Sequence, residues 1–63
     1  MIKRDLKVGD LVNRSSLLEI DFMLREVLAI KEDSVTLKFL YSGTIYDDRL
    51  KYIKESFEIV PIN

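Results

Sequence analysis

The 63 residues include no cysteine and no histidine. Without cysteine the chain has neither a disulfide framework nor a thiolate metal site, and without histidine it lacks the commonest zinc ligand and the commonest general base. We therefore expect no metal and no cofactor. The lack of cysteine is also typical of proteins kept in a reducing compartment, and we expect a cytoplasmic location.

Glycine is nearly as scarce, with only Gly9 and Gly43 in the chain. Two isolated glycines cannot form a glycine-rich phosphate-binding loop. Ser15 and Ser16 have no histidine or other obvious base to activate them as nucleophiles. A chain of this length also offers little depth for the concave pocket that enzymes use. We expect a protein that is not an enzyme.

Long apolar runs are missing as well. A membrane-spanning helix needs about 20 consecutive apolar residues, and no run in this chain approaches that length. The charged N-terminal residues are not followed by the apolar region of a secretory signal. The sequence thus predicts no association with a membrane.

What the chain does contain is 48% hydrophobic and 33% charged residues, with ten basic side chains against eleven acidic ones. This composition predicts a compact fold rather than a disordered chain. Proteins that bind nucleic acid usually carry a basic stripe, because neutralising phosphates supplies most of their affinity. The one locally basic group is small and consists of Lys3, Arg4, Lys7 and Arg14. No linker or repeat interrupts the sequence, which predicts a single domain over 1–63.

The alternation of apolar and polar residues is strictest in 34–39, which predicts a β-strand. The apolar face of this strand consists of Val35, Leu37 and Phe39. A compact polar turn at 31–34 precedes it, and such a turn joins antiparallel neighbours. We therefore expect a partner strand over about 22–31, with an irregularity such as a bulge before the apolar series resumes at Val27 or Leu28.

Turn signals delimit the other expected strands. Gly9 begins a turn that leads into a short apolar strand ending at Val12. Gly43 marks a second turn over 41–44. The segment 57–60 alternates before Pro61, which cannot donate to a β-ladder, and it is expected to be the last strand.

Two segments also fit helices. Over 16–29, Ser16 and Glu19 form a possible capping box, and apolar residues recur at helical spacing behind it. Over 48–56, Leu50 and Ile53 have helical spacing as well, and Lys54 lies where the helix dipole favours a cation. The alternative to an all-β protein is therefore an α+β fold with helices near 16–29 and 48–56.

The order of these elements resembles the small SH3-like β-barrels, a group that includes the Tudor and KOW modules. The resemblance rests on the opening Val8-Gly9-Asp10-Leu11-Val12, the central hairpin, the glycine turn at Gly43 and the closing Phe57-Glu58-Ile59-Val60. It implies an all-β fold, a barrel of about five antiparallel strands. The residues that it implies to point inward are Val8, Val12, Leu28, Ile30, Val35, Leu37 and Ile59.

The resemblance also bears on function, because members of this group mostly bind other molecules and rarely catalyse reactions. KOW-like modules that bind RNA carry basic loops, whereas the loop over 13–21 of this chain contains Glu19 and Asp21 beside Arg14. Tudor-like modules use an aromatic cage. Here the resemblance implies that such a cage would draw on Phe22, Tyr41, Tyr46 and Tyr52.

The most suggestive polar cluster consists of Tyr41, Tyr46 and Tyr52 with Asp47 and Asp48. Amphipathic aromatic rings beside carboxylates suit the recognition of a cationic or polar partner. The alternative is that the tyrosines cover a small core and that the two aspartates form a solvated turn. Two adjacent aspartates make a poor calcium or magnesium site, so no metal is expected there.

The segment 17–24 is unusually apolar for a loop. It is either part of the core, or an exposed patch through which the chain binds a protein partner or itself. The candidate contact residues are Leu17, Leu18, Phe22 and Met23.

Together these features predict a small non-enzymatic binding module that acts through protein–protein contacts and forms a homo-oligomer. One alternative is a KOW-like module that binds nucleic acid. A further alternative is an oligomer that sequesters a small molecule between its subunits.

Overall fold

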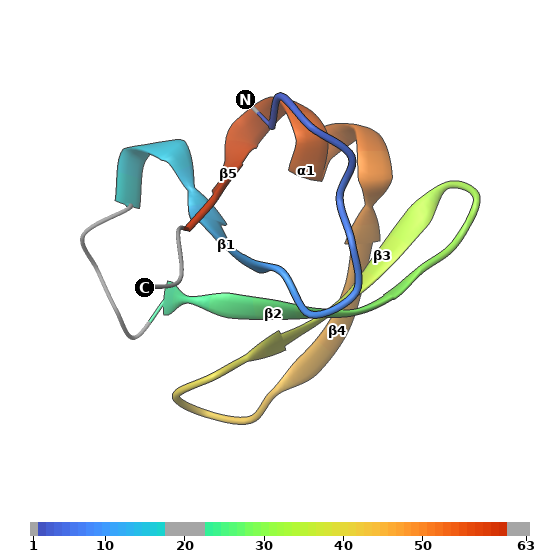
Figure 1. Ribbon diagram of the computed structural model, residues 1–63. Helices are drawn as coiled ribbons and strands as arrows, with labels where there is room; N and C mark the ends of the chain where they lie inside the picture. The colour runs from blue at the N-terminus through green and yellow to red at the C-terminus, as the bar shows by residue number, and fades with distance from the viewer. Residues whose placement is uncertain (1, 18–22, 61–63) are drawn as a thin grey trace.

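The computed structural model describes residues 2–17 and 23–60. Five strands form one antiparallel sheet in the order β4-β3-β2-β1-β5, with β4 and β5 at its edges (Figure 1). The elements are β1 (Leu11–Arg14), the 3-10 helix η1 (Ser15–Leu17), β2 (Arg25–Ile30), β3 (Ser34–Phe39), β4 (Ile45–Arg49), α1 (Leu50–Ser56) and β5 (Phe57–Ile59). The described part of the chain is thus mainly β, as expected, with one short α-helix between β4 and β5.

The central hairpin forms where the sequence predicts it. β3 covers Ser34–Phe39, and the turn before it is closed by the Lys31 backbone N–H, which donates to the Ser34 carbonyl at 2.8 Å. The strand contains an irregularity, as expected, but the register between β2 and β3 shifts between Val27 and Ala29, slightly later than predicted. β2 begins at Arg25, later than predicted, and Phe22 lies outside the described residues.

The two helical alternatives have different outcomes. A helix over 16–29 is wrong where the structure describes that segment, because Arg25–Ile30 forms β2 and pairs with both β1 and β3. A helix does form in the second segment, but α1 starts at Leu50 rather than at residue 48. Asp47 and Asp48 extend β4 instead, because they pair with Thr36 and Val35 of β3.

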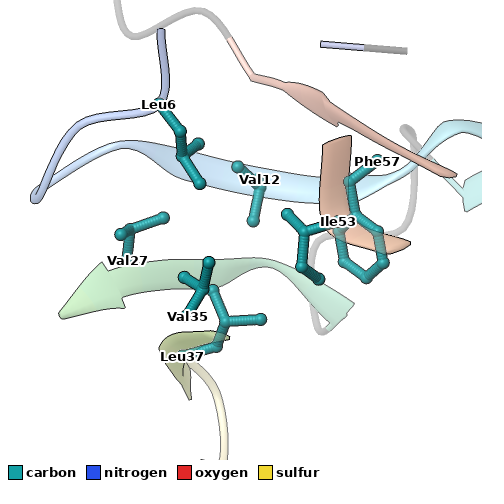
Figure 2. Close-up of a cluster of buried hydrophobic side chains, with 7 residues drawn as sticks. All are labelled: Leu6, Val12, Val27, Val35, Leu37, Ile53 and Phe57. Carbon is teal, nitrogen blue, oxygen red and sulfur yellow. The ribbon is translucent and has the colours of Figure 1, made fainter. Parts of the chain in front are cut away.

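The core lies between the sheet and α1 (Figure 2). Ile53 from α1 and Phe57 from β5 pack against the buried side chains of the strands. The N-terminal segment adds Leu6 to this core, and its Ile2 N–H donates to the Lys54 carbonyl of α1 at 2.9 Å. The buried hydrophobic residues are Leu6, Val12, Val27, Val35, Leu37, Ile53 and Phe57.

Of the residues expected to point inward, Val12, Val35 and Leu37 are fully buried, whereas Leu28 and Ile59 are only half-buried. Val8 and Ile30 are exposed, so burial of these two is a wrong expectation. Val8 is 64% exposed because it belongs to the turn before β1, where Gly9 adopts a positive φ of 96°. Ile30 ends β2 at the β2–β3 turn, beyond the reach of the core. The bulge leaves Val27, rather than Leu28, as the buried apolar residue of β2.

No helix in the described ranges is long and apolar enough to cross a membrane.

The turn before β1 is held by Asp10. The Arg4 guanidinium donates to both carboxylate oxygens of Asp10, at 3.2 and 2.9 Å, and the Lys7 backbone N–H donates to Oδ2 at 2.7 Å. The backbone of the turn is tied to β2, because the Gly9 N–H donates to the Val27 carbonyl and the Val27 N–H to the Asp10 carbonyl. The Arg4 hydrogen bond holds the pKa of Asp10 below its ordinary value, with the Lys7 N–H and nearby cations adding to this effect.

This pKa shift predicts that acid destabilises the fold through Asp10. A carboxyl whose pKa is lower in the folded state stabilises the fold above its unfolded pKa, about 3.9, and this contribution is lost as the pH falls through the folded pKa. Asp10→Asn should therefore be less stable than the wild type at neutral pH, and the difference should shrink below about pH 4. Urea unfolding of both proteins at neutral and acid pH measures this, and a difference that is constant with pH would contradict it.

Candidate partner-binding site

A row of aromatic rings centred on one arginine links four strands, β2 to β5, and α1. The Tyr46 ring stacks on Phe39 with 5.3 Å between centroids, and the Arg25 guanidinium carbon lies 4.5 Å from the Phe39 ring centre. The same guanidinium lies 4.9 Å from the ring centre of Phe57, which contacts Tyr52 edge to face at 5.8 Å. The predicted contact residues Tyr46 and Tyr52 thus belong to one continuous arrangement. Its centre is Arg25.

Arg25 is buried, with only 5% of its surface exposed. Its Nη1 donates to the Asn13 side-chain oxygen at 3.3 Å and to the Met23 carbonyl at 3.0 Å. Its buried Nε has no hydrogen-bond partner, and none of the ion pairs that the structure describes involves this residue. Its charge is therefore stabilised mainly by two aromatic faces and two neutral oxygens. The predicted contact residue Met23 takes part through its backbone.

The residues of the predicted aromatic cage do not surround an open space for a partner's cation in the described part of the chain. The faces of Phe39 and Phe57 that suit a cation are occupied by the guanidinium of Arg25. Tyr46 and Tyr52 contact these two phenylalanines, while Tyr41 lies apart in the β3–β4 turn and is exposed. The fourth candidate, Phe22, lies outside the described residues. In the described part of the chain, the cation that lies over Phe39 and Phe57 is the chain's own Arg25.

Burial raises the pKa of the Tyr46 hydroxyl, and the nearby charge of Asp48 adds a smaller increase. Arg25 acts in the opposite direction on this pKa, through its charge and through hydrogen bonding. Because the pKa is raised, the Tyr46 hydroxyl stays neutral at physiological pH. It can act as a hydrogen-bond donor or acceptor but not as a charged group.

The two predicted aspartates bond mainly to the chain itself. The Thr36 hydroxyl donates to Asp47 Oδ1 at 2.5 Å, and Lys31 Nζ lies 3.6 Å from Asp47 Oδ2. The Thr36 hydrogen bond is the main reason that the pKa of Asp47 is lowered. Asp48 Oδ1 accepts the backbone N–H of Arg49 at 2.8 Å. Charged side chains on β4 also discourage indiscriminate pairing at this edge of the sheet.

Exposed apolar side chains gather where β3 turns into β4, and we call this surface the hairpin tip. It consists of Leu40, Tyr41 and Ile45, which are 42%, 84% and 58% exposed. Of these three residues, only Tyr41 is among the contact residues predicted from the sequence. Leu40 and Ile45 could have been predicted as exposed from their positions on either side of the Gly43 turn. Side chains that flank such a turn have little core to pack against.

The backbone of the hairpin tip is well fixed. The Gly43 N–H donates to the Phe39 carbonyl and the Phe39 N–H donates to the Thr44 carbonyl, both at 2.8 Å. Gly43 adopts a positive φ of 78°, which glycine reaches without steric cost. The Leu40 N–H donates to the Leu24 carbonyl at 3.0 Å and ties the tip to the segment before β2. The exposed side chains are therefore presented from an ordered backbone.

The other predicted contact residues are spread over several elements. Tyr46, Asp47 and Asp48 lie on β4, next to the hairpin tip, and Tyr52 lies on α1. Leu17 ends the 3-10 helix η1, and Leu18 lies outside the described residues, as Phe22 does. Self-association through 17–24 thus stays a prediction. Arg25, Phe39 and Phe57 are not among the predicted contact residues, because a local sequence pattern does not show which cation the fold will bury or which rings will cover it.

In 2–17 and 23–60 no group of three or more acidic side chains is placed to hold a metal ion. No family model matches the chain significantly, and neither does any curated protein or solved structure. The function must therefore be inferred from the chain's own residues.

Proposed function

We propose that this protein is a small non-enzymatic binding domain that contacts a protein partner through the hairpin tip. The observation that carries this proposal is the exposure of Leu40, Tyr41 and Ile45 together on one ordered turn. Exposed apolar patches on small domains commonly mark interaction sites, and tyrosine is among the residues that contribute most to protein interfaces. An ordered backbone lowers the entropy cost of binding.

The charge distribution favours a protein over a nucleic acid as the partner. The net charge is -1, and Asp47 and Asp48 lie on the strand that leaves the hairpin tip. In the basic N-terminal segment, Arg4 is paired with Asp10 and is not free to contact phosphate. A nucleic-acid interface needs several unpaired cations on one surface.

We also propose that the fold is a variant of the SH3-like barrel in which the sheet does not close, because its edge strands β4 and β5 do not pair. Two features support this proposal: β5 pairs with β1, and a short helix separates β4 from β5. We further propose that the protein is not an enzyme. In support, the Ser15 hydroxyl, a potential nucleophile, donates to the Ser56 carbonyl at 3.2 Å and so has a structural role.

Photo-crosslinking tests the proposed contact. A photoreactive amino acid at position 41 should give a defined crosslinked protein product in the cells that naturally produce this domain. The same amino acid at Asp5, which is exposed but far from the hairpin tip in sequence, is the matched control. Excess unlabelled wild type should abolish the product. Equal products from both positions, or no competition, would contradict the proposal.

The variant Tyr41→Ser/Ile45→Ser separates binding from stability. These side chains lie outside the core, so the free energy of unfolding should change by less than about 0.5 kcal/mol for each substitution. The variant should nevertheless fail to compete for the crosslinked product. Urea unfolding and the competition assay measure the two effects, and full competition by the variant would contradict a role for the hairpin tip.

A further inference from the structure

A groove of about 590 Å³ lies between the β2–β3 turn and α1. One wall is the turn, which contributes Glu32 and Asp33. The other wall is formed by the start and outer face of α1 and contributes Arg49, Lys51, Lys54 and Glu55. The turn wall is therefore acidic, while the helix wall has an excess of positive charge.

The acidic wall is held in place by backbone hydrogen bonds. The Asp33 carbonyl accepts the Leu50 N–H at 3.0 Å, which fixes the turn against the first residue of α1. The turn is closed by the Lys31 N–H and the Ser34 carbonyl, and the Lys31 side chain is directed to Asp47. Glu32 and Asp33 are exposed on this fixed backbone.

The charges of the groove are not paired with one another. Within the described ranges no ion pair involves any of the six charged residues that line it. A ligand of a single charge sign would be attracted by one wall and repelled by the other. A surface that itself carries an acidic projection beside a basic one would match both walls.

A second copy of this chain has such a surface. We propose that the groove is a self-association site at which two copies meet about a two-fold axis. The acidic turn of each copy enters the groove of the other, so that Glu32 and Asp33 face Lys51 and Lys54 across the interface. A two-fold interface requires a self-complementary patch, and opposite charges on the two walls of one groove meet this requirement.

This surface is separate from the hairpin tip. The β2–β3 turn precedes β3 and the β3–β4 turn follows it, so the two surfaces lie at opposite ends of that strand (Figure 1). The two copies of a dimer would each keep a hairpin tip available for another protein. Self-association through the groove is therefore independent of the function proposed above.

A charge-swap experiment tests the groove. Sedimentation velocity of the wild type at micromolar concentration should show a dimer that weakens as salt is added. The variants Lys51→Glu/Lys54→Glu and Glu32→Lys/Asp33→Lys should each be monomeric, with dimerisation at least roughly 100-fold weaker, because like charges then face each other. An equimolar mixture of the two variants should restore the dimer, since both contacts of the heterodimer are attractive. Circular dichroism establishes that each variant is folded.

Several results would overturn this proposal. A monomeric wild type would do so, as would a dimer that persists in both charge variants. Failure of the mixture to restore association would exclude the two-fold pairing. The variant Tyr41→Ser/Ile45→Ser should leave the dimer intact, and its dissociation would place the contact at the hairpin tip instead.

Discussion

Phe57→Ala should lower the free energy of unfolding by about 3–5 kcal/mol, the range for truncating a fully buried phenylalanine. Small domains have total stabilities near the low end of about 5–15 kcal/mol, so this variant should keep little of its stability. The Phe57 ring is buried among the core side chains and also lies against the guanidinium of Arg25 and the edge of Tyr52. Its removal leaves a cavity and weakens the contacts that stabilise a buried charge.

Urea unfolding followed by circular dichroism measures this loss. Tyr41→Ala is the matched control, because it truncates an aromatic ring that is exposed, and its effect should stay within about 0.5 kcal/mol. A Phe57→Ala variant that is as stable as this control would show that β5 does not complete the core.

Arg25→Glu should be comparably damaging, with a loss of at least about 3 kcal/mol. The substitution places a carboxylate between the electron-rich faces of Phe39 and Phe57 and opposite two oxygens that now accept hydrogen bonds from the guanidinium. Each contact that stabilises a cation at this position would oppose an anion. A buried charge without a partner costs several kcal/mol.

Arg25→Met separates the effect of charge from that of packing. Burying the guanidinium costs several kcal/mol of hydration free energy. Its two cation-π contacts and two hydrogen bonds offset this cost by a similar amount. We therefore expect Arg25→Met to change the free energy of unfolding by only about 1 kcal/mol. The Asn13 oxygen keeps a partner in this variant, because it also accepts the Arg14 backbone N–H at 2.9 Å. Equal stabilities of the glutamate and methionine variants would mean that the site is open to water.

The strands that could be predicted are those with an unambiguous period. Residues 34–39 alternate strictly, and β3 has these same bounds. The residue spacing in 45–56 fits a strand in one part and a helix in another. The chain forms both, because β4 ends at Arg49 and α1 begins at Leu50. Local spacing could not locate this junction, because it depends on pairing with β3 rather than on the residues alone.

The candidate site was predictable only in part, for a similar reason. The sequence predicts one role for Tyr41 and Tyr46, as tyrosines near aspartates, but their roles differ in the fold. Tyr46 is stacked and half-buried, whereas Tyr41 is exposed beside Ile45. The burial of Arg25 depends on Phe39 and Phe57, which come from strands distant in sequence. Contacts of this kind depend on how distant strands are arranged, so they cannot be predicted from the pattern of about ten neighbouring residues.

The pairing of β1 with β5 governs how the chain reaches this fold. β2, β3 and β4 follow one another through short turns, so their ladders close small loops and can form early. Val12 and Ile59 are partners from nearly opposite ends of the chain, and their pairing closes most of it into one loop. We therefore expect this closure, with the entropy that it costs, to come late in folding, after β2, β3 and β4 have paired. Phe57 would then be absent from the folding nucleus, and its contacts would act chiefly by slowing unfolding.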